Sequence, residues 1–421
     1  MRKLTFTLKQ HTPMLHFQAS QQGATLRASD VKPRFDRWLV QTVFNGKFED
    51  CREYLVGYDS KKPDELRDKF RSGFRALNYK MHIVAGKDGQ RIPFSQFIGT
   101  DASGKKKYNA PMYFGDKTGN TVELLDNTGI ITLTINCFHD VLAEKIKGNV
   151  SDFFLRHNFG TRSSKGYGAF TVGDDMYESR LYYETKGKSY LDVLNEIDLI
   201  YKTMRSGINF GGVYFKSLMF SYARSMNLRW DKKSIKESML LPGEMKKQSG
   251  KWKNPDVLTF RNGKDDRADF RDALGLSTNE NWSFYGVKIS KKKSSIDRFA
   301  SPILFKPVKL QSSNTWRVHI FWNELPDDIY DKTISVYVDE DEKNGFKMKG
   351  KVNPDVIKQE IFKMKIPAQF KMDDYMDYIF KAKDGKYQVS IDKQFSEGCR
   401  NGGLSQKIQK IYGQLRKNYN R

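Results

Sequence analysis

The feature that most constrains the fold of this chain is a pair of strand–helix units. A long polar insertion separates the two units, and a glycine-rich loop follows the second. Residues 4–8 alternate apolar and polar side chains, as a half-buried strand does, and residues 130–135 are rich in β-branched side chains. Apolar residues at helical spacing follow each strand, within 31–42 and within 142–153. The loop at 158–168 then leads into a further strand.

This order is close to the split βαβ pattern of a ferredoxin-like domain, the fold that RNA-recognition motifs share. The pattern restarts less cleanly after residue 176, with a Lys-rich helical insertion at 212–255 and a basic amphipathic helix at 404–419. We therefore predict an α+β protein of two ferredoxin-like domains with helical and loop insertions. The predicted boundaries are 1–175, which contains the glycine-rich loop, and 176–421, which is the more divergent domain.

The charge of the chain indicates its class of partner. Lys and Arg total 73 and Asp and Glu total 50, which gives a net charge of +23. Such an excess favours polyanions through long-range attraction and counterion release. Aromatic residues make up 13% of the chain, so the sequence is that of a folded protein and not of a basic disordered tail.

Membrane association is not expected from the sequence. The N-terminal residues contain neither a basic amphipathic helix, nor a lipidation signal, nor the apolar segment of a signal peptide. No apolar run approaches the roughly 18 residues that a membrane span requires. We predict a cytoplasmic protein without a membrane partner.

The cysteines indicate neither a disulfide scaffold nor a zinc site. They are odd in number, far apart and in no CxxC arrangement: Cys51, Cys137 and Cys399. The sequence predicts no metal and no cofactor.

The glycine-rich loop is the most informative local motif. Its three glycines allow close approach of a ligand to the backbone, and successive N–H groups in such a loop can form an anion-binding nest. It is not a nucleotide P-loop, because the lysine precedes a glycine and the loop leads into a strand. A tight, charged connection without a ligand remains the alternative. The side chains that offer charge, hydroxyl donors and a stacking ring are Arg162, Lys165, Ser163, Ser164 and Tyr167.

These motifs resemble the RAMP superfamily of CRISPR-associated proteins. The nine residues from Gly160 to Gly168 match the pattern G-x-R-x-x-[KR]-G-[FY]-G at every position. Residues 11–15 and 26–38 are similar to the N-terminal motif of the family of Cmr subunit one, from type III-B effector complexes. Residues 298–305 resemble a segment in the second half of that family.

The resemblance implies a non-catalytic, crRNA-binding subunit with two ferredoxin-like domains. Such a subunit lies at the head of a type III Cmr ribonucleoprotein, near the crRNA 3′ end and beside other RAMP subunits, and helps to capture target RNA in antiviral defence. Carried over by position, RNA contacts are implied for the loop, namely Gly160, Arg162, Ser163, Ser164, Lys165, Gly166, Tyr167 and Gly168. They are implied likewise for the first helix, at Arg27, Lys32, Arg34 and Arg37.

An enzyme is the main alternative, because RAMP relatives include metal-independent endoribonucleases that process CRISPR transcripts. Their chemistry needs an acid or base near a ribose 2′-OH, and His11 and His16 are the best placed histidines. Other RAMP subunits cleave target RNA with an Asp after the first strand, and Asp30 lies in that region. Capping of the first helix by Ser29 or Asp30 explains that residue adequately. We predict no catalytic residues.

Two acidic stretches have structural interpretations. The run from Asp339 to Glu342 is typical of a solvated loop. Asp265, Asp266 and Asp269 alternate with Arg267 and Arg271, which suggests a salt-bridged helix surface. A general single-strand binder unrelated to CRISPR stays open as a third, weaker hypothesis.

Overall fold

The computed structural model divides into two compact units, here called the N-terminal unit and the C-terminal unit. The N-terminal unit comprises Met1–Asp198 and Leu304–Phe321, and the C-terminal unit comprises Leu199–Ile303 and Trp322–Arg421. The residues that the structure describes are 1–16, 25–85, 89–100, 106–108, 123–127, 129–173, 179–187, 189–210, 213–228, 230–241, 243–244, 268–275, 280–284, 287–293, 299–311, 314–330, 332–340, 352–393 and 402–421. Among them, no helix combines the length and the apolar character that a membrane span needs.

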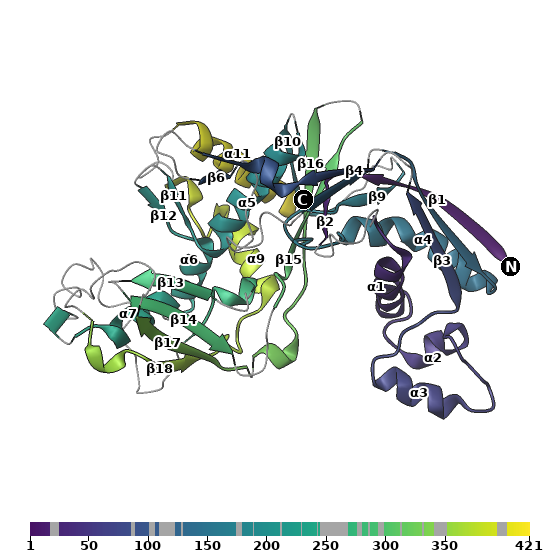
Figure 1. The fold of residues 1–421 in the computed structure, drawn as a ribbon, viewed down its shortest axis with the longest axis horizontal. Helices are drawn as coiled ribbons and strands as arrows, with labels where there is room; N and C mark the ends of the chain where they lie inside the picture. The colour runs from purple at the N-terminus through teal and green to yellow at the C-terminus, as the bar shows by residue number, and fades with distance from the viewer. Residues whose placement is uncertain are drawn as a thin grey trace. The chain divides into compact units, whose positions relative to one another are not determined.

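The main sheet of the N-terminal unit is antiparallel, and its elements follow one another as strand–helix–strand twice (Figure 1). They are β1 (Arg2–Gln10), α1 (Ala28–Thr42), β3 (Tyr79–Ala85), β8 (Ile131–Cys137), α4 (Asp140–Arg156) and β9 (Phe170–Val172). The strands lie in the order β3-β8-β1-β9. Alternate side chains of β8 are buried, because one face of the sheet packs on α1 and α4 while the other is more open. The rings of Phe35 and Phe153 meet at a centroid distance of 4.7 Å in this core.

The two strand–helix pairs are found where the apolar periodicity predicts them. The helix after β1 begins at Ala28, with Arg27 as N-cap and no capping side chain, so the predicted cap at Ser29 or Asp30 is wrong. Asp30 instead lies at the third helical position, where a carboxylate interacts favourably with the positive end of the helix dipole. Helix α4 passes through Gly148 without interruption.

Smaller elements complete the N-terminal unit. Short strands form a sheet of order β2-β7-β4, a β5-β6 hairpin and a sheet of order β10-β16-β15. The last sheet combines a strand from before residue 198 with two from 303–322, although we predicted all three in the second domain. The bounds are β2 (Met14–His16), α2 (Phe48–Cys51), α3 (Pro63–Arg71), β4 (Gly89–Pro93), β5 (Ile98–Thr100), β6 (Lys106–Tyr108), β7 (Glu123–Asn127), β10 (Tyr182–Lys186), β15 (Ile303–Lys309) and β16 (Thr315–Trp322).

The C-terminal unit contains a four-stranded antiparallel sheet of order β13-β14-β17-β18, two hairpins and several helices. Helix α5 (Tyr190–Arg205) begins in the N-terminal unit and ends in this one. The remaining elements are β11 (Ile208–Phe210), β12 (Val213–Phe215), α6 (Leu218–Ser225), α7 (Asp231–Met239), β13 (Glu280–Phe284), β14 (Val287–Lys293), β17 (Ile334–Glu340), β18 (Gln359–Met364), α9 (Met372–Phe380), β19 (Ala382–Lys383), β20 (Lys386–Tyr387) and α11 (Gly402–Tyr419).

Both interpretations of the acidic stretches need correction. Asp339 and Glu340 end strand β17, and the Asp339 carboxylate accepts a hydrogen bond from Ser290 Oγ at 3.0 Å, so these two residues do not form a solvated loop. Asp341 and Glu342 lie outside the described residues. Asp269 and Arg271 are buried and precede a short 3₁₀ turn, so they do not form an exposed helix surface. Asp265, Asp266 and Arg267 fall outside the described residues.

Asp269 belongs to a buried ion cluster in the C-terminal unit. The Lys291 ammonium lies 2.7 Å from Asp269, 3.0 Å from Asp272 and 3.1 Å from Asp231, and all four side chains are fully buried. Burial and the neighbouring Asp272 raise the pKa of Asp269 well above its usual range. Burial acts in the same direction on Asp272, but the Lys291 charge, the hydrogen bond with Asp269 and the charges of Arg271 and Arg205 together outweigh it and lower the pKa of that carboxyl. Arg205 lies 3.3 Å from Asp272 and Arg271 lies 3.8 Å from Asp231, whereas the Lys291 ammonium contacts all three carboxylates.

Candidate RNA interface

The glycine-rich loop is closed on itself and attached to the segment that follows β1. The Phe159 N–H donates to Gly168 O at 2.9 Å, which closes the loop at its base. The Gly168 N–H donates to Pro13 O at 2.9 Å, and the Thr12 hydroxyl donates to Gly166 O at 2.6 Å. The two sequence motifs that carry the RAMP resemblance, residues 11–15 and 160–168, are therefore in direct contact.

Each glycine of the loop is required by the protein itself. Gly160, Gly166 and Gly168 have φ values of +80°, +89° and +65°, in the left-handed region that glycine favours. A Cβ at Gly168 would lie 1.9 Å from Phe159 O, and one at Gly160 would lie 2.6 Å from Leu15 O. The glycines thus permit close packing of the loop on its neighbours, which does not depend on a ligand.

Part of the backbone that the predicted anion nest would use is engaged within the protein. The N–H groups of Thr161, Lys165, Gly166 and Gly168 all donate to protein carbonyls. What remains partly exposed is the start of the turn, Arg162 to Ser164, in which Arg162 has a φ of +59°. Arg162, Ser163 and Ser164 are half-exposed there, so this turn is the part of the loop that an RNA phosphate can reach.

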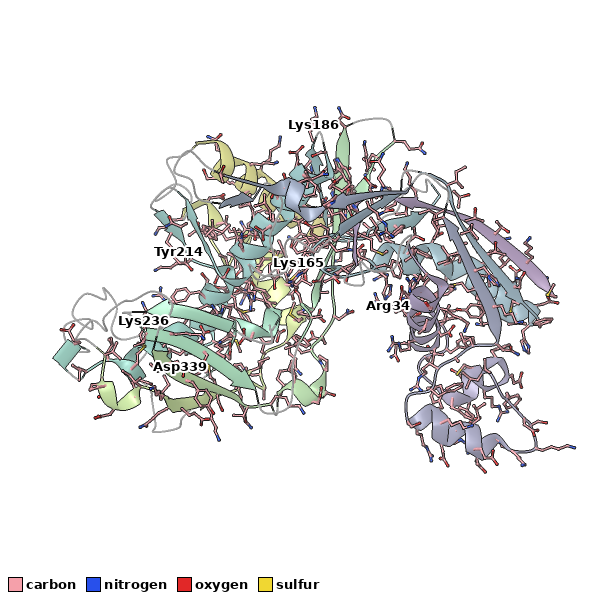
Figure 2. All side chains as sticks on the ribbon, viewed as in Figure 1. Arg34, Lys165, Lys186, Tyr214, Lys236 and Asp339 are labelled. Carbon is pink, nitrogen blue, oxygen red and sulfur yellow. The ribbon has the colours of Figure 1, made fainter. Side chains whose placement is uncertain are left out.

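Two predicted contact residues of the loop are buried. Lys165 is only 8% exposed, and Tyr167 is fully buried (Figure 2 labels Lys165). Burial, with the nearby Asp198 carboxylate, raises the pKa of the Tyr167 phenol. The Tyr167 ring therefore has no face open to a base in this structure, and its predicted role in stacking is not supported.

Helix α1 joins the loop through Arg34. The Arg34 guanidinium donates to Asn158 O at 3.2 Å and lies 5.7 Å from the Phe159 ring centroid. Asn158 Nδ2 donates in turn to Ser163 O at 2.7 Å. The fold thus brings together the two basic motifs that the sequence places about 130 residues apart. We call the residues Arg34, Arg37, Arg162, Ser163 and Ser164 the α1–loop surface.

The electrostatics of α1 distinguish its cations. Arg34 is half-buried, and burial lowers its pKa although Asp30 acts to raise it (Figure 2 labels Arg34). Arg37, one turn further along the helix, is exposed, and its Nε donates only to Pro33 O, at 3.2 Å. Arg37 is therefore the most accessible cation of α1. Arg27 is half-buried at the N-cap position.

Lys32 has a structural partner within α1. Its ammonium lies 2.6 Å from the Asp36 carboxylate, donates to Leu77 O at 3.0 Å and lies 4.3 Å from the Tyr79 ring centroid. Burial raises the pKa of Asp36, and the Lys32 charge opposes that shift. Lys32 therefore compensates a buried carboxylate, and its predicted contact with RNA stays a prediction.

A residue that the sequence does not reveal supports the base of the loop. Lys306 of β15 is fully buried, and its ammonium donates to the carbonyls of Phe154, His157 and Phe170 at 2.6–2.8 Å. Burial lowers the pKa of Lys306 well below its usual range. Because lysine is rarely fully buried, an isolated lysine in a strand gives no hint of such a role.

The catalytic candidates have structural explanations where the structure describes them. His11 is 9% exposed; its Nε2 lies 2.8 Å from Thr171 Oγ1, and its Nδ1 accepts from the Lys309 N–H at 3.1 Å. Both ring nitrogens are thus used within the N-terminal unit. The His16 side chain is not among those that the structure describes.

Metal ligands do not converge in the described part of the chain. No group of three or more His, Cys, Asp or Glu residues with the geometry of a metal site is found among the described residues. Cys51 and Cys137 are buried thiols, and burial raises the pKa of Cys51 to about 11. Cys399 lies outside the described residues.

Comparison with known proteins agrees with the motifs. Residues 1–208 match the family model described as the Cmr1 N-terminal domain, and residues 214–402 match the Cmr1 C-terminal domain. No curated protein matches the chain in sequence. The strand–helix units, the glycine-rich loop and these matches define a RAMP-type, CRISPR-associated protein. The chain belongs to the Cmr1 family.

Two solved structures show weak similarity. Cmr1 from Pyrococcus furiosus in its apo form matches with 11% identity and a TM-score of 0.36, over 78% of this chain and 90% of that chain. A type III-B Cmr-beta complex bound to cognate target RNA contains a chain that matches with 14% identity and a TM-score of 0.26. That second match covers 40% of this chain and spans 58% of the length of the other.

Proposed function

We propose that this protein is a non-catalytic, RNA-binding subunit of a type III-B Cmr effector ribonucleoprotein. It holds crRNA near the 3′ end, at the head of the complex beside other RAMP subunits, and helps to capture target RNA. Membership of the Cmr1 family supports the assignment to a Cmr complex. The net charge of +23 supports a polyanionic partner. We place the complex in the cytoplasm as part of this proposal.

The observation that carries the RNA-binding role is the junction of Arg34, Asn158 and Ser163. It links a helix that presents cations to a turn that presents two hydroxyl groups. Phosphate oxygens are bound by such mixtures of guanidinium groups, hydroxyl groups and backbone donors. The order of the main sheet, β3-β8-β1-β9 with two helices on one face, supports a ferredoxin-like fold for the N-terminal unit. We extend that fold to the second predicted domain only as part of this proposal.

The α1–loop surface can be tested by the salt dependence of RNA binding. Replacing Arg37 and Arg162 together by alanine is expected to weaken binding of single-stranded RNA. Each phosphate contact contributes about 0.7 to the slope of log affinity against log salt on single strands, so the slope should fall by about 1.4. Fluorescence anisotropy titrations of labelled RNA at several salt concentrations measure this slope.

A matched variant controls for the loss of charge. Arg71 is exposed and Arg52 is half-exposed; both lie in the same unit and are paired on the surface, with Asp68 and Glu49 respectively. Their replacement by alanine removes the same charge and should leave the slope close to that of the wild type. Equal slopes for the two double variants would contradict the assignment of the α1–loop surface.

Absence of ribonuclease activity is the second expected result. His11 has both ring nitrogens engaged within the fold, which leaves no nitrogen for a ribose 2′-OH. Purified protein incubated with a repeat RNA in EDTA should therefore leave the RNA intact on a denaturing gel. Cleavage that disappears in His11→Ala, but persists in the exposed-residue variant His82→Ala, would instead establish the endoribonuclease alternative.

A further inference from the structure

The C-terminal helix presents a basic face without any acidic side chain. Residues 402–421 contain no Asp or Glu, and their Lys and Arg residues are Lys407, Lys410, Arg416, Lys417 and Arg421. The apolar face of α11 packs on α9, where the Phe380 ring lies 6.1 Å from Tyr412 and 5.7 Å from Tyr419. Lys410 and Lys417, two helical turns apart, are exposed on the opposite side.

A short hairpin extends this basic face at the C-terminal end of α11. The hairpin joins β19 to β20 through Asp384 and Gly385, and its Lys383 and Lys386 are exposed. It is attached to the helix because the Ala382 N–H donates to Asn420 Oδ1 at 3.0 Å. We call Lys383, Lys386, Tyr387, Lys410 and Lys417 the C-terminal basic surface.

Tyr387 gives the C-terminal basic surface an aromatic ring that is held in place. The buried Arg416 guanidinium lies 4.2 Å from the Tyr387 ring centroid and donates to Val389 O at 2.6 Å. The tyrosine is nevertheless 38% exposed. A fixed cation covers the ring and part of the side chain is open to solvent, a combination that suits a platform for base stacking.

The lysines of this surface are not neutralised by nearby carboxylates. Asp377 pairs with Lys381 at 2.9 Å, and Asp392 accepts from Gln409 at 2.7 Å. Within the described part of the chain, no ion pair joins an Asp or Glu to Lys383, Lys386, Lys410 or Lys417. The only acidic side chain in the hairpin turn is Asp384. The surface therefore has a net positive charge.

We infer that the C-terminal basic surface binds single-stranded RNA, with the lysines on phosphates and one base stacked on Tyr387. The inference rests on the proposed function and adds a contact that belongs to the C-terminal unit alone. A protein partner fits less well, because protein interfaces have an apolar centre. Tyr387 is the only large exposed apolar side chain among the described residues from 372 to 421.

The phosphate contacts are tested with the variant Lys386→Ala, Lys410→Ala, Lys417→Ala. The probe is a fluorescein-labelled single-stranded RNA of about 20 nucleotides, long enough for a site of this kind, composed of adenosine and cytidine to prevent self-pairing. The slope of log affinity against log salt should fall by about 2. The matched control replaces the exposed residues Lys363, Lys365 and Lys371 of the same unit by alanine. A slope equal to that of the control overturns the inference. The inference is also overturned if the slope is unchanged and the variant no longer retains a protein that co-purifies with the wild type.

The stacking contact is tested with Tyr387→Ala and Tyr387→Phe. Loss of one base–aromatic stack lowers affinity by about 5- to 150-fold, whereas phenylalanine keeps the ring and should bind like the wild type. Equal affinities of the alanine variant and the wild type overturn the stacking contact.

Wild-type protein that does not bind the probe contradicts the proposed function as well. If the Arg37 and Arg162 variant binds weakly while the C-terminal variants bind normally, only this inference fails.

Discussion

The variant Lys291→Met is expected to lose about 3–5 kcal/mol of the free energy of unfolding. Methionine keeps most of the side-chain volume but removes the ammonium group that lies within 3.1 Å of three buried carboxylates. Removing one partner of a buried ion pair leaves an uncompensated charge without solvent. Here three carboxylates lose their closest cation, so this is the largest stability effect that we expect from any single substitution.

Urea-induced unfolding, followed by circular dichroism, measures the loss. The control is Lys288→Met on the same strand, because Lys288 is half-exposed and is not part of the ion cluster. Its stability should stay within about 0.5 kcal/mol of the wild type, as is usual for surface substitutions. Similar losses in the two variants would show that the cluster does not depend on the Lys291 charge.

The pH dependence of this loss has a predictable sign. Without Lys291, the pKa of Asp269 in the folded state rises further above its value in the unfolded chain, and Asp272 loses the charge that contributes most to lowering its pKa. The native variant then binds more protons than its unfolded state above about pH 4, so its stability falls as the pH rises. The stability difference from the wild type should therefore be larger at about pH 8 than at about pH 5.5. A difference that does not vary with pH would contradict this electrostatic explanation.

The second large effect is expected for Gly168→Ala. A Cβ there would lie 1.9 Å from Phe159 O, within the backbone contact that closes the glycine-rich loop. Left-handed strain costs about 1–2 kcal/mol, and overpacking against backbone adds about 1–3 kcal/mol. We expect a total loss of about 2–5 kcal/mol in urea unfolding, together with weaker RNA binding because the turn from Arg162 to Lys165 is displaced.

Gly173→Ala is the matched control for this substitution. Gly173 also has a positive φ, +58°, but a Cβ at this position would have no other atom within 4 Å among the described residues beyond its chain neighbours. The two variants therefore share the conformational strain and differ in the steric clash. A stability loss for Gly168→Ala no larger than that for Gly173→Ala would show that the loop can move away from the added methyl group.

The regular elements of the N-terminal unit were predictable because their signals are local. The apolar periodicity around Val31 and Phe35 places α1, and the β-branched run at 130–135 places β8, without reference to the rest of the chain. The family motifs at residues 11–15 and 160–168 were also visible as sequence patterns. Their direct contact in the structure explains why a resemblance to the RAMP superfamily appears in both.

The roles of the buried lysines could not be predicted, because each depends on residues far along the chain. Lys306 meets carbonyls about 150 residues before it, and Lys291 meets carboxylates from two other segments. The burial of Lys165 and Tyr167 could not be predicted either. Their residue types are typical of a ligand contact, but both side chains are buried. Sequence pattern therefore located the candidate site, whereas tertiary packing decides which of its side chains reach the surface.

The return of residues 304–321 to the N-terminal unit affects how this protein is made. The ribosome finishes residue 198 about 100 residues before it begins this segment, which contains Lys306 and most of β15 and β16. At about 5–20 residues per second, the delay is roughly 5–20 s. During that time the carbonyls at the end of α4 lack their ammonium partner. The N-terminal unit therefore cannot complete its folding before much of the C-terminal unit has been synthesised.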